Sequence, residues 1–258
     1  MTADPALPLS FLGLFGDAVN FIFNQQPAET GGGLAQVGGP HQVLDLASEQ
    51  LKVTALALAL SLAIAMPPAL WLGHRGKGER LAIAVGNAGR AIPELALIAI
   101  MAAVIGVGLG NLTIALSVLG IPPILTNTYV GVSQVDRGAV DAARGMGMTE
   151  PEIVRKVELP LAVPLVFGGV RTSVVNVIAT ATIAPLIGVV TLGDAIVSPQ
   201  VYGDAGQLGA AICVAALAIT AEVTLALIQM LVTPKGLKVS SPRRRGFPFM
   251  SMRRVEVS

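Results

Sequence analysis

The chain has 258 residues, of which 53% are hydrophobic and 13% are charged, and its formal net charge at pH 7 is +1. Soluble domains contain about 45–50% apolar and about 25% charged residues, so this composition excludes an ordinary soluble domain and predicts a membrane protein. Long runs of Ala, Leu, Ile and Gly favour helices over the roughly ten-residue alternating strands of a membrane β-barrel. Because a span requires about 20 residues, we expect one all-α membrane domain.

The first predicted region, residues 1–47, is an extracytoplasmic segment. Its stretch LSFLGLFGDAVNFIFN, residues 9–24, is moderately apolar and is interrupted by Gly16, Asp17 and Asn20. This pattern favours a helix that lies in the membrane interface, with a sixth span as the alternative. The region contains no Lys or Arg before residue 52, so it lacks the positive segment that begins a signal peptide.

The second region, residues 48–233, predicts a transmembrane domain. Five candidate spans cover about residues 51–72, 81–107, 112–132, 164–190 and 208–232. Pro67 and Pro68 predict a kink or an early end of the first helix, because proline lacks the N–H that a helical hydrogen bond requires.

The positions of Lys and Arg predict the orientation of these spans. Of the 17 such residues, three lie in residues 75–80, four in residues 134–163 and seven in the tail, residues 234–258, whereas residues 191–207 contain none. Because cytoplasmic loops are rich in Lys and Arg, the N-terminus is predicted outside and the C-terminus in the cytoplasm. The basic cytoplasmic tail is predicted to contact anionic lipid or to be disordered.

The loop over residues 134–163 is the most polar internal stretch, and its sequence predicts a helix, a turn and a second helix. The first helix is expected over residues 135–146. Gly145 and Gly147 mark the turn, because glycine adopts positive φ without a steric penalty.

The second helix of this loop begins at Thr149, which has Glu152 three residues on, the spacing of a capping box. Pro151 stands in its first turn, where a missing N–H costs little. We expect Leu159 and Pro160 to end it. Its apolar side chains predict that it lies in a groove, and they are Ile153, Val154 and Val157.

This loop resembles the "EAA" signature of binding-protein-dependent ABC importer permeases. That signature has E-A-A, three residues, G, nine residues, I, one residue and L-P. The chain matches every spacing, with Asp for Glu and Val for Ile. The resemblance implies a cytoplasmic coupling helix that docks on a separate ATPase, and it assigns that role to Asp141, Ala142, Ala143, Gly145, Gly147, Thr149, Glu152, Val157, Leu159 and Pro160.

The resemblance extends over about residues 45–235. There the chain is similar to the osmoprotectant permeases for glycine betaine, choline, carnitine or proline. It is carried by WLGHRGKGER, GRAIPELALIAI, IPPILTNTYVGV and GVRTSVVNVIATATIAPLIG. It implies about five spans, alternating access, an ATPase dimer, a solute-binding protein and a second permease subunit, identical or paralogous. After the fourth span, Val190 and Thr191 replace glycines that the family usually carries.

The sequence offers no nucleotide site of its own. Its nearest approach to a P-loop, GHRGKGER, has Gly78 where the motif requires Ser or Thr. ATP and Mg are therefore expected on the partner ATPase, with no cofactor on this chain, no enzymatic role and no nucleic-acid partner. Cys213 lies within a span, and His41 and His74 are far apart, so no metal site is predicted.

Polar residues inside the spans are candidates for a solute pathway, because such groups usually face protein or water. Hydrogen bonds between helices are an equal alternative. Arg90 and Glu94 have the spacing of a pair on one helix, with a reach of Arg90 toward the cytoplasm as the alternative. Arg171 is expected to reach toward the cytoplasm. For Glu222 three roles are open, which are lining the pathway, contact with a second subunit and pairing between helices. The pathway candidates are Arg90, Glu94, Asn127, Tyr129, Asn176, Thr180 and Thr182.

Three alternatives remain at this stage. An ABC permease for amino acids such as methionine shares the five-span plan. A secondary transporter would work without an ATPase, and a membrane scaffold would not need the 134–163 loop.

Overall fold

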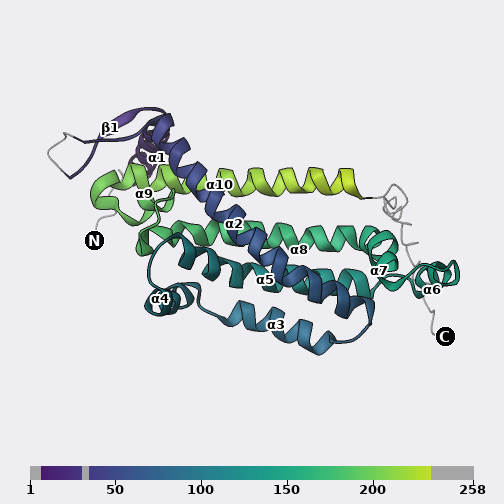
Figure 1. The fold of residues 1–258 in the computed structure, drawn as a ribbon. Helices are drawn as coiled ribbons and strands as arrows, with labels where there is room; N and C mark the ends of the chain where they lie inside the picture. Colours follow the sequence, from purple (N-terminus) through teal and green to yellow (C-terminus); the bar gives the residue numbers. More distant parts are fainter. Residues whose placement is uncertain (1–6, 31–34, 234–258) are drawn as a thin grey trace, which may run out of the picture.

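The structure is a computed structural model that describes residues 7–30 and 35–233 (Figure 1). The predicted basic tail, residues 234–258, lies outside the described residues. The elements are α1 (Leu7–Phe23), β1 (Gln25–Pro27), β2 (Gln36–Gly38), α2 (Gly39–His74), α3 (Glu79–Ala91), α4 (Glu94–Ile105), α5 (Leu109–Ser133), α6 (Arg137–Gly145), α7 (Glu150–Ile153), a π-helical segment (Val154–Glu158), α8 (Leu159–Thr180), a 3₁₀ segment (Ala181–Ile187), α9 (Gly193–Val197) and α10 (Pro199–Val232).

Membrane-spanning helices dominate the described part of the chain. Four helical stretches are long and apolar enough to cross a membrane, and α3 with α4 makes a fifth if the bent pair counts as one span. This confirms the predicted all-α membrane fold of about five spans. A short antiparallel ribbon, β1 with β2, was not predicted.

The first span is longer than its apolar stretch. α2 begins at Gly39 and runs through Pro67 and Pro68 to His74, so the early helix end that the prolines suggested is wrong. Proline is tolerated in spanning helices where the packed surroundings hold the helical geometry. Ala65 and Ala69, on either side of the prolines, are fully buried.

The second predicted span is broken. α3 and α4 meet at 88°, and between them Ile92 and Pro93 are extended, with ψ near 120° at both residues. A residue that precedes proline is pushed out of the α region by the proline ring, which accounts for the end of α3. The span predicted within residues 81–107 is therefore a bent pair of helices.

The fourth span joins the 134–163 loop directly. The second helix of that loop does not end at Leu159 and Pro160, as predicted. It continues through the π-helical Val154–Glu158 into α8, and Pro160 stands in the first turn of α8.

Buried small residues hold the bundle together. α5 packs against α2, α3 and α8, and α10 packs against α8 and α1. A Cβ on Gly169 of α8 would lie 2.6 Å from the Pro123 carbonyl oxygen of α5, so these helices approach closely only because glycine is there. Gln50 of α2 is fully buried and donates to the Ile178 carbonyl of α8 at 2.8 Å.

The two ends of the bundle differ. α6 and α7 lie together at one end, whereas α1, β1 and α9 lie at the other (Figure 1). At this second end Phe21 of α1 is buried against Gly206 and Gly209 of α10. The interfacial position expected for α1 stays a prediction.

Candidate functional site

The 134–163 loop forms a helix, a turn and a second helix, as its sequence predicts. α6 begins after Asp136, whose carboxylate accepts a hydrogen bond from the Gly138 backbone N–H at 2.8 Å. Asn, Asp, Ser and Thr are favoured at this position because they satisfy a free N–H of the first turn.

The turn depends on Gly147 rather than on both predicted glycines. Gly147 has φ +83°, whereas Gly145 is the last residue of α6 and is not among the residues with positive φ. A Cβ on either glycine would meet nothing within 4 Å. Substitution at Gly147 would therefore be costly through its backbone conformation alone.

The predicted capping box is present. Glu152 Oε2 accepts hydrogen bonds from the backbone N–H and the hydroxyl of Thr149, both at 3.0 Å. Lys156 Nζ lies 2.8 Å from Glu152 Oε1. The Lys156 ammonium, with the Thr149 hydrogen bonds, lowers the pKa of Glu152 to about 2.

The apolar side chains of the loop pack against each other. Val140, Ala143 and Ile153 are buried, and Met148 and Val157 pack on them. The predicted groove for Ile153 is thus formed within the loop itself. Ala142, Gly145, Met146 and Gly147 are exposed and form the outer surface of the turn.

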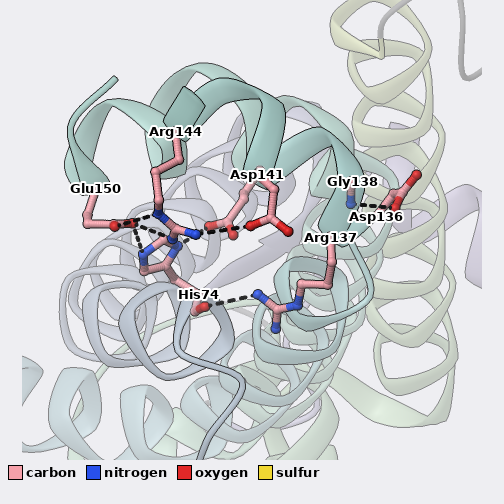
Figure 2. Close-up of polar contacts among 8 residues, drawn as sticks. His74, Asp136, Arg137, Gly138, Asp141, Arg144 and Glu150 are labelled. Atoms are coloured by element: carbon pink, nitrogen blue, oxygen red, sulfur yellow. Dashed lines mark hydrogen bonds and ion pairs between the residues drawn. The ribbon is translucent and has the colours of Figure 1, made fainter. Parts of the chain in front are cut away.

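A chain of charged side chains connects the loop to the end of α2 (Figure 2). His74 Nδ1 lies 2.8 Å from Glu158 Oε2, and His74 Nε2 lies 2.9 Å from Glu150 Oε2. Arg144 contacts both Glu150 oxygens, at 3.0 and 3.1 Å, and Asp141 Oδ1 at 3.1 Å. Glu158 is fully buried.

The chemistry of this chain follows from its donors and acceptors. Each ring nitrogen of His74 lies within hydrogen-bond distance of a carboxylate, one from Glu150 and one from Glu158. Hydrogen bonds from Arg144 lower the pKa of Glu150, and Glu150 raises the pKa of Arg144. Arg137 Nη1 also donates to the His74 carbonyl at 3.3 Å.

A cavity of about 270 Å³ lies among α3, α4, α5 and α8. It brings three of the predicted pathway residues together, Glu94, Asn127 and Asn176. Its further polar lining, Thr126 and Thr172, was not predicted.

The other pathway candidates lie elsewhere or act indirectly. Thr180 donates to Glu94 Oε2 at 2.8 Å and so positions that carboxylate. Tyr129 is buried with Ala69 and Ala82, and Thr182 donates to the Ala179 carbonyl at 2.7 Å. These two do not line the 270 Å³ cavity.

The predicted pair of Arg90 and Glu94 on one helix is wrong. α3 ends at Ala91, and Pro93 separates it from α4. Arg90 and Glu94 therefore belong to different helices, and a spacing of four residues does not place them on one helix face. The side chain of Arg90 lies outside the described part of the structure.

A second hollow, of about 600 Å³, lies between α8 and α10. Arg171 of α8 forms an ion pair with Glu222 of α10 on its wall, and its Nη1 donates to Gln229 Oε1, nearer the C-terminal end of α10, at 3.3 Å. Pairing between helices was one of the roles left open for Glu222. Thr172 and Asn176 line both this hollow and the 270 Å³ cavity.

Comparison with known proteins identifies the family. The model of the family described as "Binding-protein-dependent transport system inner membrane component" matches residues 55–235. The chain belongs to this family. This permease is accordingly an inner-membrane transport subunit.

Similar proteins cover most of the permease. It is 35% identical to the glycine betaine/carnitine/choline transport system permease protein OpuCB of Bacillus subtilis (strain 168), over 76% of this chain and 91% of the relative. It is also 35% identical to the carnitine transport permease protein OpuCB of Listeria monocytogenes, over 77% of this chain and 91% of the relative.

Solved structures share the fold of the permease. A chain of the MetNI methionine ABC transporter in inward-facing conformations superimposes with a TM-score of 0.64 at 22% identity, over 74% of this chain and 96% of that one. A chain of an amino acid ABC transporter with histidines gives 0.54 at 19% identity, over 90% of this chain and 100% of that one. The fold is that of ABC importer permeases.

Proposed function

We propose that this chain is the permease subunit of an ATP-driven importer for osmoprotectants such as glycine betaine, choline and carnitine. The observation that carries the proposal is the 35% identity over 91% of the length of a permease named for these solutes. The structures named for amino acid transporters are 22% and 19% identical to this chain, which is a likeness of fold.

The proposed partners follow from the same assignment. A separate ATPase dimer holds ATP and Mg, since this sequence has no P-loop. A solute-binding protein delivers solute outside, and a second permease subunit, identical or paralogous, completes the pathway in the membrane. The N-terminus is outside and the C-terminus is cytoplasmic.

The 134–163 loop is proposed as the contact with the ATPase. Its exposed turn surface presents the small residues Ala142, Gly145 and Gly147, together with the exposed side chain of Met146. Ala143 and Val157 support the loop from inside. Asp141, at the start of the motif, pairs with Arg144 and so fixes the face of α6 that carries Ala142.

Two connections transmit movement of the loop to the spans in this proposal. One is the continuous helical path from Glu150 through the π-helical segment into α8, which carries Asn176 on the cavity wall. The other is the ion pairing of His74 at the end of α2 with Glu150 and Glu158. Tilting of α2 and α8 would open the cavity alternately to each side.

Uptake by the purified transporter tests the proposal. The permease is reconstituted in liposomes with its ATPase and binding protein, and labelled glycine betaine uptake is measured with and without ATP. We expect uptake that requires ATP and is competed by choline and carnitine but not by methionine. Uptake by the permease alone, or a preference for methionine, would contradict it.

A further inference from the structure

The ion pair of Arg171 and Glu222 lies deep in the membrane domain. Arg171 is about 18 Å along α8 from Leu159, and Glu222 is about 15 Å from the end of α10 at Val232, at about 1.5 Å per residue. A hydrocarbon core about 30 Å thick, with one edge near Leu159 and Val232, would hold both charges near its middle. Charges at that depth are expensive and are retained mainly where they serve function.

The hydrogen-bond donors of Arg171 are not all paired with acceptors among the described residues. Its Nη2 pairs with Glu222 Oε1, and its Nη1 donates to Gln229 Oε1 at 3.3 Å. Its Nε is buried and has no acceptor among the residues that the structure describes. A buried donor without an acceptor costs about 1–3 kcal/mol, so protein partners alone do not satisfy the Arg171 guanidinium.

The pair faces space rather than packed protein. The hollow of about 600 Å³ between α8 and α10 has Arg171, Glu222, Thr172 and Asn176 on its wall. The side chains of Arg171 and Glu222 are 30% and 38% exposed, so a small molecule in the hollow can reach both. Thr172 and Asn176 also line the neighbouring cavity that holds Glu94.

We propose that Arg171 and Glu222 form a binding site for the solute in the membrane, with Arg171 taking a carboxylate and Glu222 facing a quaternary ammonium. This inference rests on the proposed function. A zwitterion brings one charge of each sign, so it can enter between the two side chains without leaving either charge unpaired. The resting ion pair then keeps the empty site neutral.

The two solute classes separate the roles of the two residues. Glycine betaine carries both a carboxylate and a quaternary ammonium, whereas choline carries the ammonium and a hydroxyl. Glu222 should therefore matter for both solutes. Arg171 should matter mainly for glycine betaine, because only the carboxylate makes a charged hydrogen bond to a guanidinium.

The experiment uses the complete transporter in liposomes, with the unaltered binding protein saturated with labelled solute, so that the rate reports the permease. For Glu222→Gln we expect uptake of both solutes to fall about tenfold. For Arg171→Gln we expect glycine betaine uptake to fall about tenfold, while choline uptake changes less than about threefold. Gln229→Leu is the matched control, because Gln229 contacts Arg171 but does not line the hollow, and its two rates should keep the wild-type ratio.

Arg171→Lys covers the case in which the other variants fail to assemble. Lysine keeps the charge and the pairing with Glu222 but loses the planar donor fork, so membrane levels should hold while the ratio of glycine betaine to choline uptake falls about threefold or more.

Two outcomes overturn the inference. One is an equal loss for both solutes in Arg171→Gln and Arg171→Lys, which would make the pair a contact between helices or between permease subunits. The other is unchanged uptake in every variant. If the wild-type transporter takes up neither solute, the proposed function itself fails.

Discussion

Glu158 is the residue whose environment is most demanding. It is fully buried, its Oε2 contacts His74, and its Oε1 has no partner among the described residues. Breaking a buried ion pair by removing one partner costs about 3–5 kcal/mol, because the other charge stays buried. His74 therefore stabilises the start of α8 as well as connecting it to α2.

We expect His74→Ala to destabilise the permease by about 3 kcal/mol and to reduce ATP-driven uptake. A thermal unfolding measurement in detergent and an uptake assay check the two effects. The double variant His74→Ala with Glu158→Leu removes the buried charge as well, so it should regain stability but not uptake. Wild-type uptake in both variants would show that the His74 contacts do not transmit movement.

Residue contacts within one turn were predictable, and distant ones were not. The capping box of Thr149 and Glu152 spans three positions, so its spacing identified it. His74 and Glu158 are 84 positions apart, and nothing in either neighbourhood reveals the other. Arg171 and Glu222 were each noticed as intramembrane charges, but only the packing of α8 on α10 pairs them.

At the scale of an element, the importance of the turn between α6 and α7 can be tested at two glycines that lie two positions apart. Gly147→Ala places a side chain at φ +83°, at a cost of about 1 kcal/mol. Gly145→Ala lies in α6, where alanine is favoured over glycine by about 1 kcal/mol. Neither Cβ meets an atom within 4 Å, so the pair isolates the backbone effect.

We expect Gly147→Ala to weaken co-purification of the ATPase and to reduce uptake at unchanged membrane levels, whereas Gly145→Ala should leave the docking geometry intact. Equal ATPase binding by both variants would show that docking does not depend on the conformation of this turn.

The helices themselves were predictable from apolar runs, but several of their ends were not. The N-terminal part of α2, residues 39–50, contains polar residues such as Asp45 and Glu49, so its sequence does not indicate a span. It is helical because its apolar side packs at the end of the bundle that carries α1, where Val43 and Leu46 join the core around Phe21. Tertiary packing here extends the helix beyond the apolar segment that hydropathy predicts.

At the scale of the whole molecule, the proposed orientation has a direct test. Asp204 and Met146 are both exposed and lie toward opposite ends of the bundle. After Cys213→Ala, we expect Asp204→Cys to react in intact cells with an impermeant thiol reagent added outside, and Met146→Cys to react only after lysis. Asp204 is preferable to Gly203, whose φ of +66° disfavours any side chain. Reversed labelling would place the 134–163 loop outside and remove its proposed contact with the ATPase.

α2 also has a mechanical consequence. Its 36 residues make a rod of about 54 Å, far longer than a hydrocarbon core of about 30 Å. One end carries His74, and the other follows directly from β2 beside α1. A rod of that length displaces its ends relative to each other by about 5 Å for every 5° of tilt. A tilt of α2 that begins at the His74 end would thus be carried to the opposite end, where the β1–β2 ribbon would move with it.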